Sequence, residues 1–134
     1  MSVVLNNDLS ETERLGSELE SFASRCGLSA KDSYQLNLIL EEVVANVIAY
    51  AYDDGGRHRI VVRVERKDRE LIMDVEDDGK PFNPLEITPP VLNLSLEEMK
   101  VGGLGLHFVR KFTSSMQYER TEGKNRLRLT KTIA

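Results

Sequence analysis

Two residues on one expected helix carry functional groups that suit catalysis. Glu42 and Asn46 lie four residues apart in a long segment with helical periodicity, so both side chains project from one face of that helix. A carboxylate one turn from a carboxamide can supply a general base and an oxygen ligand for a hard cation. The alternative is a surface glutamate beside an asparagine that bonds its own backbone, and the spacing alone does not decide between the two.

A second polar motif, with the sequence DDGKPF at residues 77–82, directly follows a predicted strand. An acidic side chain at the end of a strand can point into a cleft while a following glycine lets the backbone turn. The alternative is a polar turn without a ligand.

A third motif, with the sequence GGLGL at residues 102–106, begins a predicted helix. Glycines let a ligand approach the backbone, and the free N–H groups of a helix N-terminus favour phosphate. No Gly-Lys-Ser/Thr follows, so the motif is not a Walker loop, and it does not match the dinucleotide fingerprint. A flexible hinge explains the same glycines.

The order of the three motifs is more specific than any one of them. It resembles the GHKL ATPase superfamily, which holds gyrase, histidine-kinase and mismatch-repair ATPase domains. Within that superfamily the chain is similar to the short anti-sigma-factor serine/threonine kinases. The residues that carry this narrower resemblance are Asn46, Ala51, Tyr52, Asp77, Gly79, Phe82 and 102–106. The resemblance covers nearly the whole chain.

The resemblance implies roles for four residues of the first two motifs. Glu42 corresponds to the family's general base, and Asn46 corresponds to the residue that holds Mg²⁺. Asp77 is expected to accept the adenine amino group, with Gly79 giving room beneath the base. Asp78 competes for the adenine contact, but its spacing to Gly79 does not fit the motif.

The resemblance also implies the remaining nucleotide contacts. Gly103 and Gly105 are expected to border the phosphates, and Gly123 with Asn125 resembles the last glycine box, which closes the adenine end. The other expected nucleotide-binding residues belong to the motifs already described and are Phe82, Leu104 and Leu106.

One position departs from the family pattern. The family usually has His-Ala-Tyr after the asparagine, whereas this chain has Tyr50 in place of the histidine. The change puts in doubt a contact near the phosphates, but it leaves Glu42 and Asn46 intact, so we expect ATP binding to be retained. His107 is expected to be a surface or packing residue.

The resemblance predicts an ATP- and Mg²⁺-dependent serine/threonine protein kinase in a partner-switching circuit. Its implied protein substrate is a STAS-type antagonist, and its implied second partner is a sigma factor. The alternative is a regulator that uses the nucleotide only to grip a protein partner, with little or no phosphotransfer. A histidine-kinase fragment is disfavoured because neither His58 nor His107 is placed as a phospho-acceptor.

The periodicity of the chain predicts the elements that must position these residues. Apolar spacing and end signals favour a short strand at 3–5 and helices at 11–26, from Ser29 to about 51, and from 106 to 112. A capping box at Ser10 and Glu13 is expected to begin the first helix, and Gly27 to end it. Alternation of period two predicts hairpins over 60–75 and 116–132.

These elements predict an α+β fold, in which three helices cover one face of a mainly antiparallel mixed sheet. This two-layer sandwich is the histidine-kinase-like ATPase fold that the resemblance implies. One domain over residues 1–134 is expected. The Pro- and Gly-rich connection over 77–105 is expected to include an ATP lid at about 83–103, with a short helix near 95–98.

Composition and charge exclude some classes of ligand and favour one cellular location. The chain has 134 residues and a net charge of −4, which argues against nucleic-acid and anionic-membrane binding. One cysteine and no leader or apolar span favour a cytoplasmic protein. Because no basic patch is available for the phosphates, we expect nucleotide binding to weaken when Mg²⁺ is chelated. A homodimer is a further expectation carried by the resemblance.

Overall fold

The computed structural model describes residues 1–86 and 104–133. Within this part of the chain it contains five strands, three α-helices and one short 3₁₀ helix. In chain order they are β1 (Ser2–Asn6), α1 (Glu11–Arg25), α2 (Ala30–Tyr50), β2 (Arg59–Lys67), β3 (Glu70–Asp77), η1 (Pro84–Glu86), α4 (Leu104–Phe112), β4 (Ser115–Thr121) and β5 (Lys124–Thr132). The expected helix at 95–98 and most of the expected lid lie outside the described residues.

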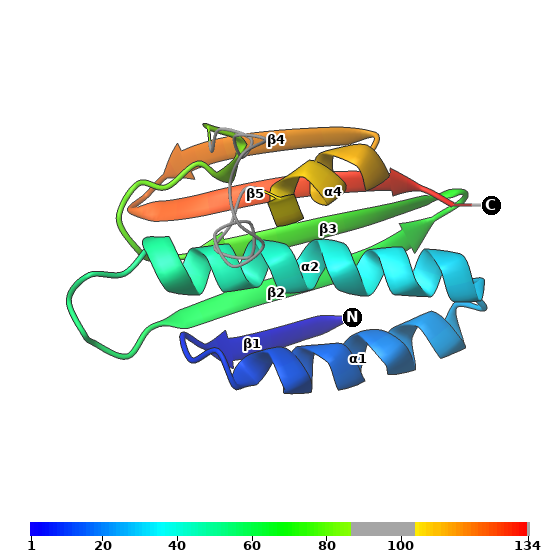
Figure 1. Cartoon of the computed structure of the whole chain (residues 1–134), viewed down its shortest axis with the longest axis horizontal. Helices are drawn as coiled ribbons and strands as arrows, with labels where there is room; N and C mark the ends of the chain where they lie inside the picture. Colours follow the sequence, from blue (N-terminus) through cyan, green and yellow to red (C-terminus); the bar gives the residue numbers. More distant parts are fainter. Residues whose placement is uncertain (87–103, 134) are drawn as a thin grey trace.

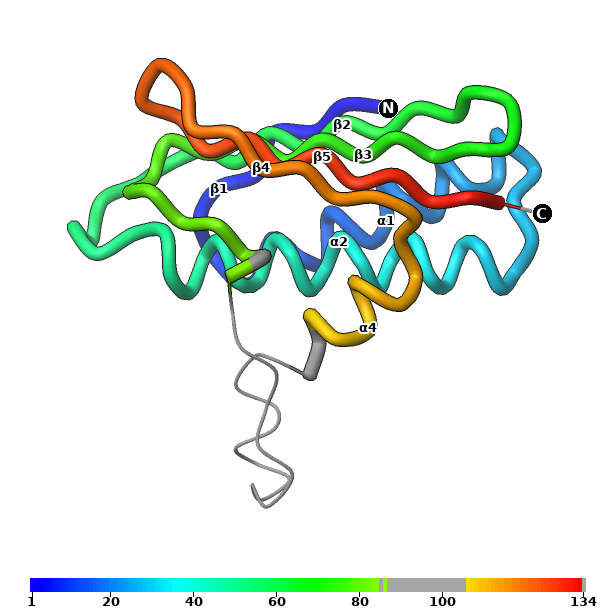
Figure 2. Tube along the Cα trace, turned by 90° about the horizontal axis from the view of Figure 1, so that it is seen from above, coloured from blue at the N-terminus to red at the C-terminus, as the bar shows by residue number. Residues whose placement is uncertain are grey.

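The strands form one sheet in the order β1-β2-β3-β5-β4 (Figure 1). All four pairings are antiparallel. Figure 2 shows the sheet as one layer and α1, α2 and α4 together on one of its faces. The predicted two-layer architecture is confirmed.

Alternation along the strands explains which face meets the helices. In β3 the side chains of Leu71, Met73, Val75 and Asp77 are buried, whereas their neighbours are more exposed. The middle helix, α2, contributes the longest buried stripe, because it lies between α1 and α4 in both views. The polar end of this pattern, at Asp77, leads into the loop that contacts the C-terminal end of α2.

The two helix N-termini were predicted with unequal success. Ser29 caps α2 as expected, because its side chain accepts from the backbone N–H of Asp32 at 3.1 Å. The capping box at Ser10 is wrong, because Ser10 has helical backbone angles and its side chain makes no cap hydrogen bond. Asp8, two residues earlier, instead accepts from both the backbone N–H and the hydroxyl of Ser10.

Candidate functional site

One face of the C-terminal half of α2 carries the first motif. Glu42, Asn46 and Tyr50 follow at intervals of four residues, so they lie along one side of the helix. Asn46 is 5% exposed, and its amide nitrogen donates to the backbone carbonyl of Glu42 at 2.7 Å. Asn46 therefore does bond its own helix backbone, as the alternative interpretation of the sequence expected. Its side-chain oxygen has no hydrogen-bond partner in the described part of the chain, and this oxygen is the atom that a cation would need.

Glu42 is half-buried on the same face. Burial raises the pKa of its carboxyl group, and the neighbouring charge of Glu41 raises it further. Among residues 1–86 and 104–133 the carboxylate of Glu42 makes no hydrogen bond or ion pair. A carboxylate that is partly desolvated without a structural partner, and whose proton affinity is raised, is suited to accept a proton.

The end of β3 separates the two acids of the second motif. Asp77 continues the buried side of the strand and is 3% exposed, whereas Asp78 is exposed. The carboxylate of Asp78 lies 3.1 Å from Nδ1 of His58, in the loop that follows α2. This alternation favours Asp77 over Asp78 as the inward-facing acceptor.

The carboxylate of Asp77 is held by two donors on one oxygen. Its Oδ1 accepts from the backbone N–H of Gly79 at 2.9 Å and from the amide nitrogen of Asn125 at 2.9 Å. Burial raises the pKa of Asp77, although both hydrogen bonds oppose the shift. Its Oδ2 has no hydrogen-bond partner in the described residues, so one oxygen remains for a ligand.

Gly79 has a packing reason to be glycine. A Cβ on Gly79 would overlap the carbonyl oxygen of Ala51 and lie 2.8 Å from the Ala51 Cβ. The next N–H, of Lys80, donates to that same carbonyl at 2.8 Å. The loop after β3 therefore lies directly against the end of α2. The role beneath the adenine base stays a prediction.

Aromatic rings join the same two segments. The ring of Phe82 lies 5.8 Å from the ring of Tyr50, the residue that replaces the family's usual histidine. The second motif thus packs against the end of α2, one to two turns beyond Asn46 of the first motif.

The third motif is only partly described. Gly102 and Gly103 lie outside the described residues, and α4 begins with Leu104 and Gly105. Leu106 is 2% exposed and packs in the core, so its side chain anchors α4. Any contact of Leu106 with a ligand would therefore use its backbone.

The last glycine box forms the turn between β4 and β5. Gly123 has φ +76° and follows Glu122, which has φ +52°. The turn gives Gly123 a conformational role, and its predicted contact near adenine stays a prediction. Asn125 is 3% exposed and faces Asp77 in the register of β3 and β5.

Sequence reasoning missed two residues of β4 that contact this cluster. The hydroxyl of Tyr118 and the Nη1 of Arg120 both donate to Oδ1 of Asn125. Arg120 also donates to the carbonyl of Gly79 at 2.7 Å. Alternation in β4 could have indicated that both residues point toward the helices, but no local pattern indicates their partners.

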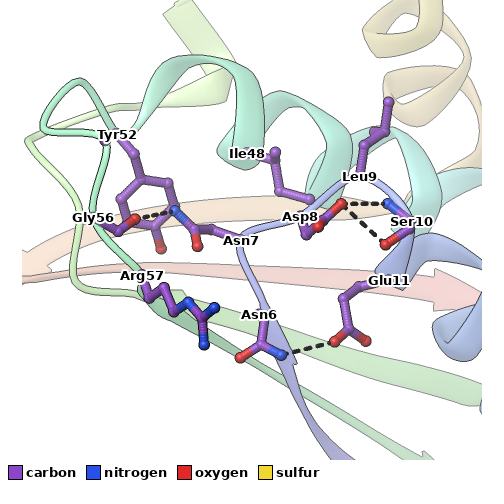
Figure 3. A pocket seen from close by; sticks show the side chains of 11 residues that line it. Asn6, Asn7, Asp8, Leu9, Ser10, Glu11, Ile48, Tyr52, Gly56 and Arg57 are labelled. Carbon is purple, nitrogen blue, oxygen red and sulfur yellow. Dashed lines mark hydrogen bonds between the residues drawn. The ribbon is translucent and has the colours of Figure 1, made fainter.

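A separate hollow of about 670 Å³ lies between the β1–α1 turn and the α2–β2 loop (Figure 3). None of the predicted site residues that the structure describes lines it. Tyr52 does, and its hydroxyl is buried without a hydrogen-bond partner in the described residues. The candidate site is therefore defined by the predicted residues themselves and not by this hollow.

Comparison with known proteins identifies the domain. The sequence model of the histidine kinase-like ATPase domain matches residues 5–131. The chain belongs to this family. The resemblance drawn from the three motifs is confirmed, and membership of the family implies that the domain binds ATP.

Two relatives indicate the branch of the family. The serine/threonine-protein kinase BtrW of Bordetella bronchiseptica is 31% identical over 112 residues, which are 84% of this chain and 79% of that protein. An anti-sigma F factor of Shouchella clausii is 24% identical over 110 residues, which are 81% of this chain and 75% of that protein. This ATPase domain is thus related to the anti-sigma-factor type of serine kinases.

Solved structures share the fold. The RsbU and RsbW domains of Rv1364c from Mycobacterium tuberculosis match with a TM-score of 0.70 at 16% identity, covering 99% of this chain and 32% of that chain. The chain thus spans about a third of that structure. The SiaB–SiaC complex of Pseudomonas aeruginosa matches with a TM-score of 0.59 at 15% identity, covering 98% of this chain and 89% of that chain. In the described part of this ATPase domain, no helix is long and apolar enough to cross a membrane.

Proposed function

We propose that this ATPase domain is a serine/threonine protein kinase of the anti-sigma-factor type. The observation that carries the proposal is the half-buried carboxylate of Glu42, which has a raised pKa and no structural partner in the described residues. It lies one helical turn from Asn46, whose side-chain oxygen is also unused. A module that only binds a nucleotide needs no such base.

The residues fit ATP at the adenine end. Asp77 offers one unused carboxylate oxygen beside a loop held by backbone contacts, which suits the amino group of adenine. The N–H groups at the start of α4 suit phosphate oxygens. Asn46 and a phosphate would together suit Mg²⁺, which prefers oxygen ligands and, when bound, offsets phosphate charge. The dependence of binding on Mg²⁺ stays a prediction.

Glu42 performs the protein's part of the transfer. It takes the proton from a serine or threonine hydroxyl as that oxygen bonds to the γ-phosphorus, and the bond from that phosphorus to the bridging oxygen of ADP breaks. ADP leaves with the electron pair of the broken bond. The segment over 83–103 is proposed as a lid that excludes water during this step.

The protein substrate is proposed to be a STAS-type antagonist, and a sigma factor the second partner. The names of the relatives, a serine/threonine kinase and an anti-sigma factor, support this class of circuit. A second candidate function is a nucleotide-dependent protein-binding regulator. The replacement of the usual histidine by Tyr50 is the observation that favours it, and a homodimer remains compatible with both.

The test is transfer of labelled γ-phosphate from ATP to candidate STAS proteins by wild type and Glu42→Gln. Removal of a general base lowers the transfer rate by about 10²- to 10⁴-fold. The same variant should bind ATP within roughly threefold of wild type, because Glu42 acts on the hydroxyl proton. Equal transfer by both proteins would contradict the role of Glu42. Absence of transfer by wild type to every STAS protein encoded nearby would favour the binding regulator.

A further inference from the structure

Two side chains of the β4–β5 hairpin, Asn125 and Arg120, contact the loop that follows β3, and a third, Tyr118, contacts Asn125. Tyr118 and Arg120 come from β4, and Asn125 comes from β5. In the register of the sheet, Asn125 lies opposite both Arg120 and Asp77. We call these three hairpin residues the hairpin clamp.

Asn125 uses every hydrogen that it can donate within the protein. Its Nδ2 donates to Oδ1 of Asp77 at 2.9 Å and to the carbonyl oxygen of Lys80 at 2.8 Å. A primary amide has two N–H donors, so none remains for a ligand. Asn125 therefore acts on neighbouring residues and not as a donor to the nucleotide.

The orientation of this amide is fixed by its partners. Its Oδ1 accepts from the backbone N–H of Phe82 at 3.2 Å, from the hydroxyl of Tyr118, and from Nη1 of Arg120 at 3.2 Å. Two of these groups can only donate, whereas the carbonyl of Lys80 can only accept. A flipped amide would leave several buried groups unpaired.

The clamp leaves Asp77 with one usable oxygen. Asn125 and the N–H of Gly79 both bond Oδ1, so rotation of the carboxylate would break two hydrogen bonds. Arg120 holds the Gly79 carbonyl at 2.7 Å and so fixes the loop on the other side. Only Oδ2 is left to accept from a ligand, and its direction is set by the protein.

We propose that Asn125, oriented by Tyr118 and Arg120, is a positioning residue that makes Asp77 select a purine with an amino group at C6 over one with a carbonyl there. The inference rests on the proposed function, because it needs ATP as the ligand. A fixed carboxylate oxygen accepts from an amino group, but it faces the carbonyl of hypoxanthine with two acceptors and no proton. A carboxylate free to rotate could instead accept the N1–H of hypoxanthine.

The test compares the affinities of ATP and inosine triphosphate by calorimetry, for wild type and Asn125→Asp. The variant keeps the shape of the side chain but loses both donors. ATP affinity is expected to fall by roughly tenfold to a hundredfold, while inosine triphosphate affinity changes by less than about threefold. The preference of wild type for ATP should therefore largely disappear in Asn125→Asp.

The pH profile provides a second readout. In Asn125→Asp two carboxyl groups share the space beside the Gly79 loop, so one of them binds a proton more strongly. ATP affinity of the variant should then depend on pH between about 4 and 7 more steeply than that of wild type. The added carboxyl group titrates whatever the role of Asn125, so this profile tests whether residue 125 lies beside Asp77 in solution, and the ratio of the two nucleotide affinities tests the positioning role.

Two arginines of the same hairpin provide a matched pair in case Asn125→Asp does not fold. Arg120→Met removes the bond to Gly79 and should lower the ratio of ATP to inosine triphosphate affinity by about twofold to fivefold. Arg128→Met removes only an ion pair with Asp74 on the open face of the sheet, so it should leave that ratio unchanged.

The outcomes separate this inference from the function on which it rests. If ATP and inosine triphosphate affinities fall by the same factor in Asn125→Asp and in Arg120→Met, the clamp is structural and the positioning role is overturned. If wild type binds the two nucleotides equally, the assignment of Asp77 to the base fails as well. If wild type binds neither, the proposed function itself fails.

Discussion

Two buried polar clusters lie near opposite ends of β5. In the closed cluster, around Lys131, the buried charges pair with each other. In the open cluster, around Asp77 and Asn125, one carboxylate oxygen has no partner in the described residues. Near its C-terminal end, Lys131 is 5% exposed and its Nζ lies 2.6 Å from Oε1 of Gln35 and 3.5 Å from the carboxylate of Asp32. Near its N-terminal end, Asn125 holds Asp77, a neutral amide against a carboxylate. The first cluster contains a buried anion with its own buried cation, whereas the second contains no buried cation among the described residues.

The difference supports a structural role for the first cluster and agrees with the ligand-binding role proposed for the second. A buried charge is costly unless it is paired, and Lys131 with Asp32 forms such a pair. Asp77 lies in the open cluster, where burial raises the pKa of its carboxyl group despite two hydrogen bonds. A donor from a ligand would relieve that cost. The open end is also where the loop carrying Asp77 meets the end of the helix that bears Glu42 and Asn46.

The largest effect on stability is expected at the closed cluster. Lys131→Met leaves the carboxylate of Asp32 without its buried cation, which should lower the free energy of unfolding by about 3–5 kcal/mol. Denaturant unfolding of wild type and variant measures this difference. Lys131→Met combined with Asp32→Asn should recover part of the loss, because the anion is removed as well. A loss below about 1 kcal/mol in the single variant would mean that the cluster is not closed as described.

A smaller effect is expected where the open end meets α2. Gly79→Ala places a Cβ against the carbonyl oxygen of Ala51, and overpacking of this kind costs about 1–3 kcal/mol. The loop that carries Asp77 should shift, so ATP affinity should fall too. Gly16→Ala in α1 is the matched control, because its Cβ would lie 3.9 Å from Asn37 and an alanine favours a helix. Equal thermal stability of Gly79→Ala and wild type would contradict the close packing.

Much of this comparison could be predicted from the sequence, and the part that could not has a physical reason. Alternation places Asp77 on the buried side of its strand, and helical spacing places Glu42 and Asn46 on one face. The bond between Asn125 and Asp77, however, joins residues 48 positions apart. Such partners depend on strand order and register, which no local pattern specifies.

The N-termini of α1 and α2 show that a local pattern can also fail at short range. Ser29 and Ser10 both precede a helix with an acid three residues later, yet only Ser29 caps. Asp8 competes for the N–H and the hydroxyl of Ser10, because aspartate readily bonds the backbone two residues on. A pattern of residue types predicted both ends equally, and the neighbouring competitor decided between them.

The smallest effect is a pH dependence at the loop beside Asp77. Side chains of Asp54 and Asp78 lie 2.8 Å and 3.1 Å from the two ring nitrogens of His58, and the ring of Tyr52 stacks on the imidazole. The hydrogen bond to Asp54 and the two carboxylate charges raise the pKa of His58 above 6.5. The stabilisation is therefore complete below about pH 6.5 and is lost as the pH rises through the higher pKa of the folded state.

Thermal unfolding of wild type and His58→Gln between about pH 5.5 and 8.5 measures this contribution. At the acidic end, wild type should melt at a higher temperature than His58→Gln. The difference between the two melting temperatures should shrink toward the alkaline end. A difference that grows with pH would contradict the two ion pairs of His58.

The proposed role of Asp77 is that of a buried carboxylate whose burial cost is relieved when a ligand donates to it. Asp77→Asn removes the buried charge but keeps an oxygen for the donors of Gly79 and Asn125. The decisive measurement is ATP affinity by calorimetry together with thermal unfolding of the same nucleotide-free variant. We expect ATP affinity to fall by roughly tenfold to a hundredfold while the melting temperature stays equal or rises. Unchanged ATP affinity, with a large loss of stability, would show instead that Asp77 is a structural residue like Asp32.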